Sequence, residues 1–223
     1  MLMKVRVLGV FAALFVAACD PNAQAPISST AIVGTKAIIQ AHSKQRIAEV
    51  TDVTGKIVTT DFTDWEGQFL YSQLDYRGLF PIGGRENNGN QWELDFDESL
   101  LEPLFPLQVG KEVSFTGNLQ TFKDGGQHEM WVHLEVVGQK SISLPDGQHR
   151  VMVVEVSREY RWQGKIQRST NIMYFDPKLS MTLKMVIRER GSQSYWRVLS
   201  VERPGHVEQA TPTRQRRSGT VMI

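Results

Sequence analysis

Alternation of apolar and polar side chains, broken by glycine turns, is the feature that most limits the fold of this chain. In residues 181–188 every second side chain is apolar, namely Met181, Leu183, Met185 and Ile187. Residues 151–162 carry a similar face, formed by Met152, Val154, Val156, Tyr160 and Trp162. Because successive side chains of a strand point to opposite faces, this period of two predicts half-buried β-strands.

Short turns separate these segments. Glycine stands in the sequence at residues 54–55, 124–126, 146–147 and 163–164, where a tight hairpin needs a positive φ. Strands joined by such short links pair with their neighbours in sequence, so the pattern predicts an antiparallel meander. The hairpin at Gln163-Gly164, between two long alternating segments, is the clearest example.

The first half of the chain is less regular. Residues 35–50 are compatible with a helix, or with a segment that ends in a strand from Arg46 to Val53. Residues 78–91 contain Pro81, two adjacent glycines and an Asn-rich stretch, and are expected to form a long loop. Residues 97–104 are expected to form a short helix with Asp97 as its N-cap.

The expected fold is therefore all-β with minor helix. A strongly curved antiparallel meander must cover its apolar face, which it can do as a half-barrel, a barrel or a sandwich, with one or two short helices as cover. The segments 36–50 and 97–104 are the candidates for those helices.

The N-terminus has the pattern of an export signal. Lys4 and Arg6 precede an apolar run, Val7–Val16, that is too short for a membrane-spanning helix, which needs about 20 apolar residues. The run ends in Val16-Ala17-Ala18-Cys19, and Cys19 is the only cysteine of the chain. These four residues resemble the lipobox of bacterial lipoproteins.

This resemblance implies that the signal is removed before Cys19, that the Cys19 thiol takes a diacylglycerol, and that the new amino group is acylated. The membrane would then be the partner, reached through the lipid on Cys19. Two or three acyl chains anchor a protein firmly where one does not. The expected location is the cell envelope, on the periplasmic side. Asp20 resembles an inner-membrane retention signal of enteric bacteria, but the choice between inner and outer membrane stays open.

Four segments follow from these patterns. Residues 1–18 are the expected signal peptide, 19–35 a lipidated flexible tether, 36–203 the β domain and 204–223 a disordered basic tail. Three motifs in the C-terminal half, residues 105–111, 142–147 and 174–179, resemble uncharacterised β-rich periplasmic proteins. Those are similar in outline to the curved-sheet carriers that transport lipoproteins. The resemblance consists mostly of turn residues and implies no catalytic group.

Charge argues against nucleic-acid binding. The 25 basic residues include Lys4 and Arg6, so residues 19–223 hold 23 basic and 24 acidic side chains. A dedicated nucleic-acid binder would normally show a basic face. No nucleic-acid partner is therefore expected.

Catalytic motifs are not evident. His128 and His133 resemble the zinc-protease pair but are five residues apart instead of four, so a strand would place them on opposite faces. His149 is a further candidate that would have to join one of them across a sheet. Glu93, Asp95 and Asp97 share one face at period two and are the candidate carboxylates of an enzyme acting on cell-wall or polysaccharide material. We predict no catalytic residue, no metal site and no cofactor.

Aromatic side chains supply the candidate binding residues. If several lined a concave sheet face, they could hold an acyl chain. The segment around residues 76–81 is the candidate mouth of such a site, and the predicted ligand-binding residues are Tyr76, Arg77, Phe80, Trp92 and Trp131. The predicted function is that of a lipid-anchored, non-enzymatic envelope protein that binds an apolar ligand or a protein partner at the membrane surface. The envelope enzyme is the alternative.

Overall fold

The computed structural model describes residues 30–123, 125–162, 164–189 and 191–205. The expected signal peptide, the expected lipidation site Cys19 and residues 206–223 of the expected basic tail lie outside the described residues.

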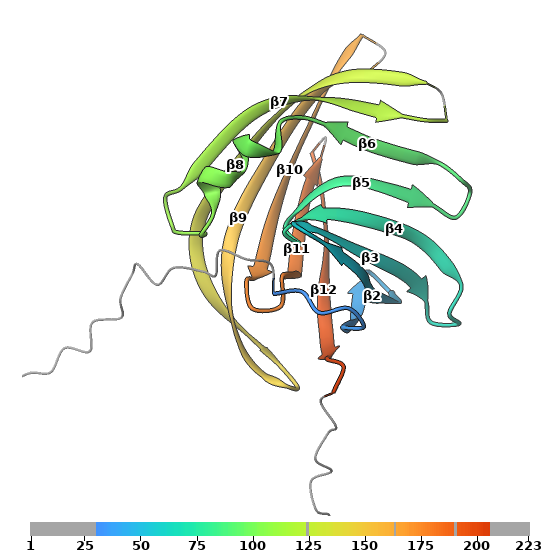
Figure 1. Cartoon of the computed structure of the whole chain (residues 1–223), viewed down its shortest axis with the longest axis vertical. Coiled ribbons are helices and arrows are strands. Elements are labelled where there is room, and N and C mark those ends of the chain that lie inside the picture. The colour runs from blue at the N-terminus through green and yellow to red at the C-terminus, as the bar shows by residue number, and fades with distance from the viewer. Residues whose placement is uncertain (1–29, 124, 163, 190, 206–223) are drawn as a thin grey trace, which may run out of the picture.

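Twelve antiparallel strands form a closed barrel (Figure 1). Each strand pairs with its neighbours in sequence, and β1 closes the barrel by pairing with β12. The all-β antiparallel meander predicted from the alternation is thus confirmed, in its barrel form. The strands are β1 Lys36–Ala41, β2 Lys44–Thr54, β3 Ile57–Asp64, β4 Phe69–Tyr76, β5 Phe80–Glu86, β6 Gln91–Asp95, β7 Glu112–Thr121, β8 Gly126–Leu144, β9 Gly147–Trp162, β10 Lys165–Asp176, β11 Met181–Glu189 and β12 Ser192–Glu202.

The two ends of the barrel differ. In an up-and-down meander every second connection lies at the same end. The connections after β2, β4, β6, β8 and β10 therefore share one end, which we call the closed end. The connections after β1, β3, β5, β7, β9 and β11 share the other, which we call the open end.

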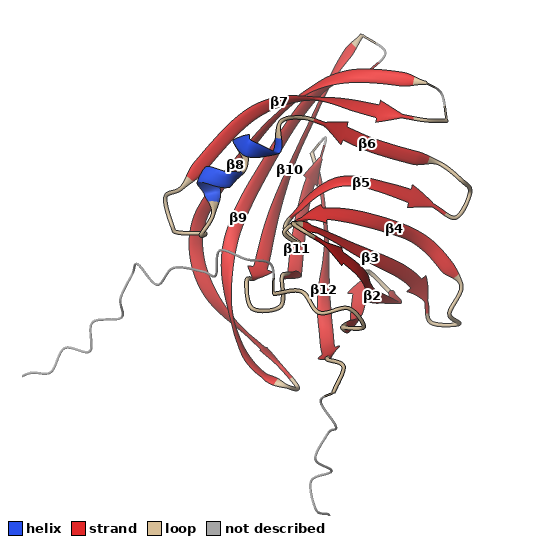
Figure 2. Cartoon of the chain, viewed as in Figure 1, coloured by secondary structure: helices blue, strands red, loops and turns tan. Residues whose placement is uncertain are grey.

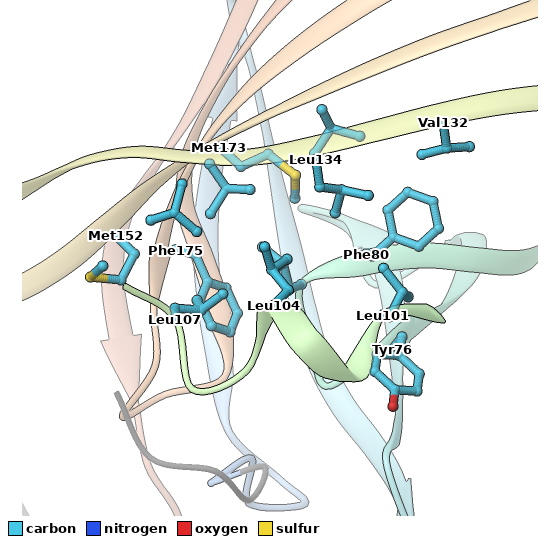
Figure 3. Packing of buried hydrophobic residues seen from close by; sticks show 14 of the residues in the cluster. Tyr76, Phe80, Leu101, Leu104, Leu107, Val132, Leu134, Met152, Met173 and Phe175 are labelled. Atoms are coloured by element: carbon cyan, nitrogen blue, oxygen red, sulfur yellow. The ribbon is translucent and has the colours of Figure 1, made fainter. Parts of the chain in front are cut away.

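A twelve-stranded barrel has more interior than its own side chains fill, since eight strands are already just filled by theirs. Part of this space is filled by the connection between β6 and β7, which carries two 3-10 helical turns, η1 Glu98–Leu100 and η2 Glu102–Leu104 (Figure 2). Leu101, Leu104 and Leu107 of this connection are fully buried among inward side chains of the barrel (Figure 3). Asp97 caps η1 by accepting a hydrogen bond from the Ser99 amide at 2.9 Å, so the predicted cap is confirmed.

A cluster of charges fixes this connection to the closed end. The Glu102 carboxylate of η2 lies 3.1 Å from Arg77 Nη2 and 2.9 Å from Lys56 Nζ, and it accepts a hydrogen bond from the Tyr76 hydroxyl. Burial alone would raise the pKa of Glu102, but the three donors together outweigh it and lower the pKa to about 2. Glu102 is therefore ionised at neutral pH and neutralises Arg77, whose side chain is 8% exposed.

The first half of the chain differs in part from expectation. The covering helix over residues 36–50 was wrong, and the alternative strand from Arg46 to Val53 is confirmed by β2, because Ala37, Ile39, Ala48 and Val50 are buried at period two in the hairpin of β1 and β2. Residues 78–91 are not one long loop, because they contain β5. The adjacent glycines, Gly83 and Gly84, belong to this strand. Glycine is needed at residue 84 because a Cβ there would lie 2.8 Å from the Ser72 carbonyl oxygen of β4 and 2.9 Å from Trp92 Nε1 of β6.

The segment before β1 contacts the barrel. Thr30 donates a hydrogen bond to the Pro177 carbonyl at 2.7 Å, and the Gly34 amide donates to the Val50 carbonyl at 2.7 Å. Thr35 is 2% exposed. Residues 30–35 thus belong to the closed end of the barrel and not to a flexible tether. None of the helical turns in the described part of the chain has the length and apolar character needed to cross a membrane.

Candidate functional site

The interior that the β6–β7 connection leaves unfilled is a cavity of about 790 Å³. This volume lies within the usual range for small-molecule sites, about 300–1,000 Å³. At the open end the cavity reaches exposed residues, including Glu86, Gln91 and Lys123. At the closed end it stops at the buried residues Leu79 and Ser180. The cavity is therefore a blind pocket that is entered from one end of the barrel.

The wall of the pocket is mainly apolar. Inward positions of β8, β10 and β11 contribute Met130, Met173 and Met185, whose flexible thioethers adapt to ligands of varied shape. Aromatic rings line other parts of it, and two of them, Phe62 and Tyr71, stack with centroids 4.3 Å apart. The aromatic residues of the wall are Phe62, Tyr71, Trp92, Tyr160 and Trp196.

Two ionisable side chains of opposite charge lie deep in this wall. Asp75 projects from β4 and Arg158 from β9, and both line the cavity. The carbon at the centre of the Arg158 guanidinium is 5.2 Å from the ring centroid of Phe80, which belongs to the packed core. Arg158 therefore lies where the filled part of the barrel meets the cavity.

Burial controls the charge of both groups. It raises the pKa of the Asp75 carboxyl to about 7, although a hydrogen bond from Gln73 and the positive charge of Arg158 act in the opposite direction. Burial also lowers the pKa of Arg158 to about 10, against the influence of Asp75. At neutral pH Arg158 thus keeps its charge, whereas Asp75 is partly protonated.

Two further polar atoms of the wall lack a partner. Asn171 Oδ1 and Thr182 Oγ1 are buried and have no hydrogen bond to any described residue. An unsatisfied buried polar atom costs about 1–3 kcal/mol. Such atoms are more typical of a binding site than of a packed core.

Substitution of Asp75 by asparagine is expected to stabilise the ligand-free protein at alkaline pH. The pKa of Asp75 is about 7 in the folded state and 3.8 for the unperturbed group. Between these values the folded state binds a proton that the unfolded state releases, so stability falls as pH rises from about 4 to about 7. Asp75→Asn removes this loss, and we expect a gain of up to about 4 kcal/mol at pH 8 and little change at pH 4.

Urea unfolding at pH 4, 6 and 8 measures this effect. Asp95→Asn, at an exposed position of β6, is the matched control and should leave the pH profile of the wild type unchanged. Equal profiles for Asp75→Asn and wild type would show that Asp75 is ionised throughout.

The structure separates the five predicted ligand-binding residues. Trp92 lines the cavity. Tyr76 and Phe80, 0% and 1% exposed, belong to the packed core, and Arg77 is paired with Glu102, so the segment expected to form the mouth lies at the closed end of the barrel. Trp131 is 45% exposed on the outer face of β8.

Sequence reasoning missed Asp75 and Arg158. Arg158 stands at period two between Val156 and Tyr160, both of which were assigned to the apolar face of the strand. A single cation on an otherwise apolar face was the signal that could have identified it. Asp75 gave a weaker signal, because β4 is too polar for a clear alternation.

The groups of the enzyme hypothesis do not meet in the described structure. Glu93 and Asp95 lie exposed on the outside of β6, and Asp97 caps η1. None of these carboxylates lines the cavity, and none of the histidines that the structure describes does so.

The histidines have separate surroundings. His128 and His133 lie on opposite faces of β8, as their odd spacing predicted, because the face of His128 is that of the buried Met130. His149 Nδ1 lies 2.8 Å from Asp176 Oδ2, and its Nε2 lies 3.0 Å from Asp146 Oδ1. On the outer face, possible ligand atoms of Glu112, His133 and Glu135 come within 4.8 Å of one another, so this group has the geometry for a divalent cation.

Among the solved structures that are similar to this chain is a hypothetical lipoprotein, YmcC, from Escherichia coli K12 (8% identity, TM-score 0.49, 76% of this chain and 85% of that one). Others are a provisionally assigned lipoprotein from Parabacteroides distasonis (10%, 0.47, 78% and 99%) and a provisionally assigned exported protein with a YmcC-like fold from Bacteroides fragilis (11%, 0.45, 78% and 97%). No protein-family model and no curated protein sequence matches the chain.

Proposed function

We propose that this protein is a lipid-anchored envelope protein that binds an apolar or amphiphilic ligand inside its barrel. The observation that carries the proposal is the blind cavity of about 790 Å³ with its methionine and aromatic wall. A protein whose barrel served only as scaffold would gain stability from filling this space, because packed interiors leave few voids. The sequence predicted either an apolar ligand or a protein partner, and a cavity of this size favours the ligand.

The anchor part of the proposal rests on Cys19 and the residues before it. Replacing Cys19 by serine removes the thiol that would carry the lipid, and we expect the protein to leave the membrane fraction and to lose the mass of its acyl groups. Ser29→Ala, a similar small change in the same segment, should leave both properties as in the wild type. The measurement is intact mass together with membrane fractionation of the protein made in bacteria. Persistence of membrane binding and unchanged lipid mass in Cys19→Ser would contradict the anchor.

The ligand part can be tested with the protein's own tryptophans. Trp92 and Trp196 line the cavity, whereas Trp65 and Trp131 are exposed, at 62% and 45%. A neutral alkyl chain carrying bromine, such as 9,10-dibromo-octadecanol, quenches tryptophan fluorescence on contact. With the full lipidated protein in phosphatidylcholine nanodiscs, we expect saturable quenching.

Pairs of variants locate the quenching. It should be largely lost when Trp92 and Trp196 are both changed to phenylalanine, and kept when Trp65 and Trp131 are changed instead. The same quenching in both double variants would place the probe in the bilayer and refute a ligand in the barrel.

A further inference from the structure

The charge of Arg158 inside the barrel has no carboxylate partner among the described residues. The ion pairs of that part of the chain involve other side chains, and Asp75, the one group that acts electrostatically on Arg158, is not within ion-pair distance of it. Buried charges in proteins are normally paired, because an unpaired one is costly. Arg77, which is buried, contacts Glu102 at 3.1 Å, whereas the partly exposed Arg158 has no such contact.

The position of Arg158 makes its guanidinium available to a ligand. The side chain is partly exposed, and its place on the inner face of β9 means that this exposed surface faces the cavity. Phe80 lies under the guanidinium, at 5.2 Å, and supports it from the side of the packed core. A guanidinium held in this way presents parallel N–H donors that match a carboxylate or a phosphate.

The surroundings of Arg158 define the rest of the ligand. Asp75 lines the same cavity from β4 and acts electrostatically on Arg158. When it is protonated, its carboxyl can donate a hydrogen bond to the anionic group that Arg158 binds. The methionines of β8, β10 and β11 line the same cavity and offer an apolar surface to a flexible chain. An anion without an apolar part would leave most of this wall uncovered.

We propose that Arg158 binds the anionic headgroup, a carboxylate or a phosphate, of a single-chain amphiphile whose apolar chain lies along the methionines of the cavity. This inference rests on the proposed function, because it specifies the ligand of the same pocket. It adds that the pocket selects for negative charge, which an apolar wall alone cannot do.

Competition against the brominated alcohol tests the inference. The competitors are oleate, 1-oleoyl lysophosphatidic acid and oleyl alcohol, which share one chain and differ in the headgroup, and the protein is again the full lipidated chain in nanodiscs. The variant is Arg158→Gln. The matched control is Arg161→Gln, three residues along β9 at an exposed position.

We expect Arg158→Gln to lower the affinity for at least one of the two anions, oleate and lysophosphatidic acid, by about tenfold or more. The affinity for oleyl alcohol should change by less than about twofold. Arg158→Lys, which keeps the charge but not the paired donors, should bind the same anion with intermediate affinity. If only the affinity for lysophosphatidic acid falls, the headgroup is a phosphate, and if only that for oleate falls, it is a carboxylate. If both affinities fall, the site accepts either headgroup. Arg161→Gln should match the wild type for all three competitors.

Two other results are decisive in the opposite direction. If Arg158→Gln binds both anions as tightly as the wild type, or loses affinity for all three competitors equally, the role of Arg158 is refuted while the cavity remains a ligand site. If the brominated alcohol does not bind the wild type, the proposed function fails before the headgroup is reached. The two failures are therefore distinguishable.

Discussion

Substitution of Ser169 by tryptophan should strongly weaken binding of alkyl ligands to the barrel while leaving the fold in place. Ser169 lies on the inner face of β10, opposite Arg158 in the pairing of β9 and β10, and its partly exposed side chain lines the cavity. An indole at this position would occupy space that the ligand needs. It would displace little packed protein, so the strain of overpacking a filled core, about 1–3 kcal/mol, is mostly avoided.

The neighbouring residue provides the control. Arg168 points outwards from the same strand with 73% of its side chain exposed, and its ion pair with Glu159 contributes at most about 1 kcal/mol. Arg168→Trp therefore adds the same side chain outside the barrel. In the fluorescence titration, we expect Ser169→Trp to lose at least about tenfold in affinity for the brominated alcohol, which corresponds to about 1.4 kcal/mol. Arg168→Trp should bind like the wild type. Equal affinities for the two variants would mean that the ligand does not enter the cavity.

Substitution of Gly78 by alanine should strongly destabilise the closed end. Gly78 has φ +71°, and a Cβ at this position would lie 2.0 Å from the Ser180 carbonyl oxygen. The turn between β4 and β5 can approach the turn between β10 and β11 only because Gly78 has no side chain. The left-handed conformation costs an alanine about 1–2 kcal/mol. The two backbones would also have to move apart to relieve the overlap, so we expect the free energy of unfolding to fall by about 3 kcal/mol or more.

Substitution of Gly55 is the control that separates the effect of the overlap from that of the backbone conformation. Gly55 lies in the turn between β2 and β3 and has φ +60°, and a Cβ at this position would have no neighbouring atom within 4 Å. Gly55→Ala should therefore lose only about 1 kcal/mol. Thermal unfolding measures both, and for a chain of this size the expected difference in melting temperature is about 4–8 °C or more. Should the two variants melt together, the contact that seals the closed end would be absent.

Prediction from sequence succeeded where local pattern decides structure. The period of two located the long strands of the second half and assigned Val154 and Val156 to the inner face, because a half-buried strand has this pattern in almost any context. It did not decide between helix and strand for β1 and β2, where alanine and glutamine are good helix formers and only pairing with neighbouring strands makes the segment extended.

The cavity could not be predicted in the same way. Whether the concave face is open or filled depends on the number of strands that close the barrel and on how deeply Leu101, Leu104 and Leu107 enter it. Both are properties of the whole chain. Arg158 is the exception, since its place on an apolar face was visible in the sequence before its surroundings were known.

The most direct test of a ligand inside the barrel is to locate bromine in a crystal of the protein grown with 9,10-dibromo-octadecanol. If the ligand lies in the barrel, we expect anomalous peaks within about 4 Å of Met130, Met173 or Met185, the contact distance of apolar atoms. Peaks confined to the outside of the barrel, or side chains that fill the interior, would contradict it.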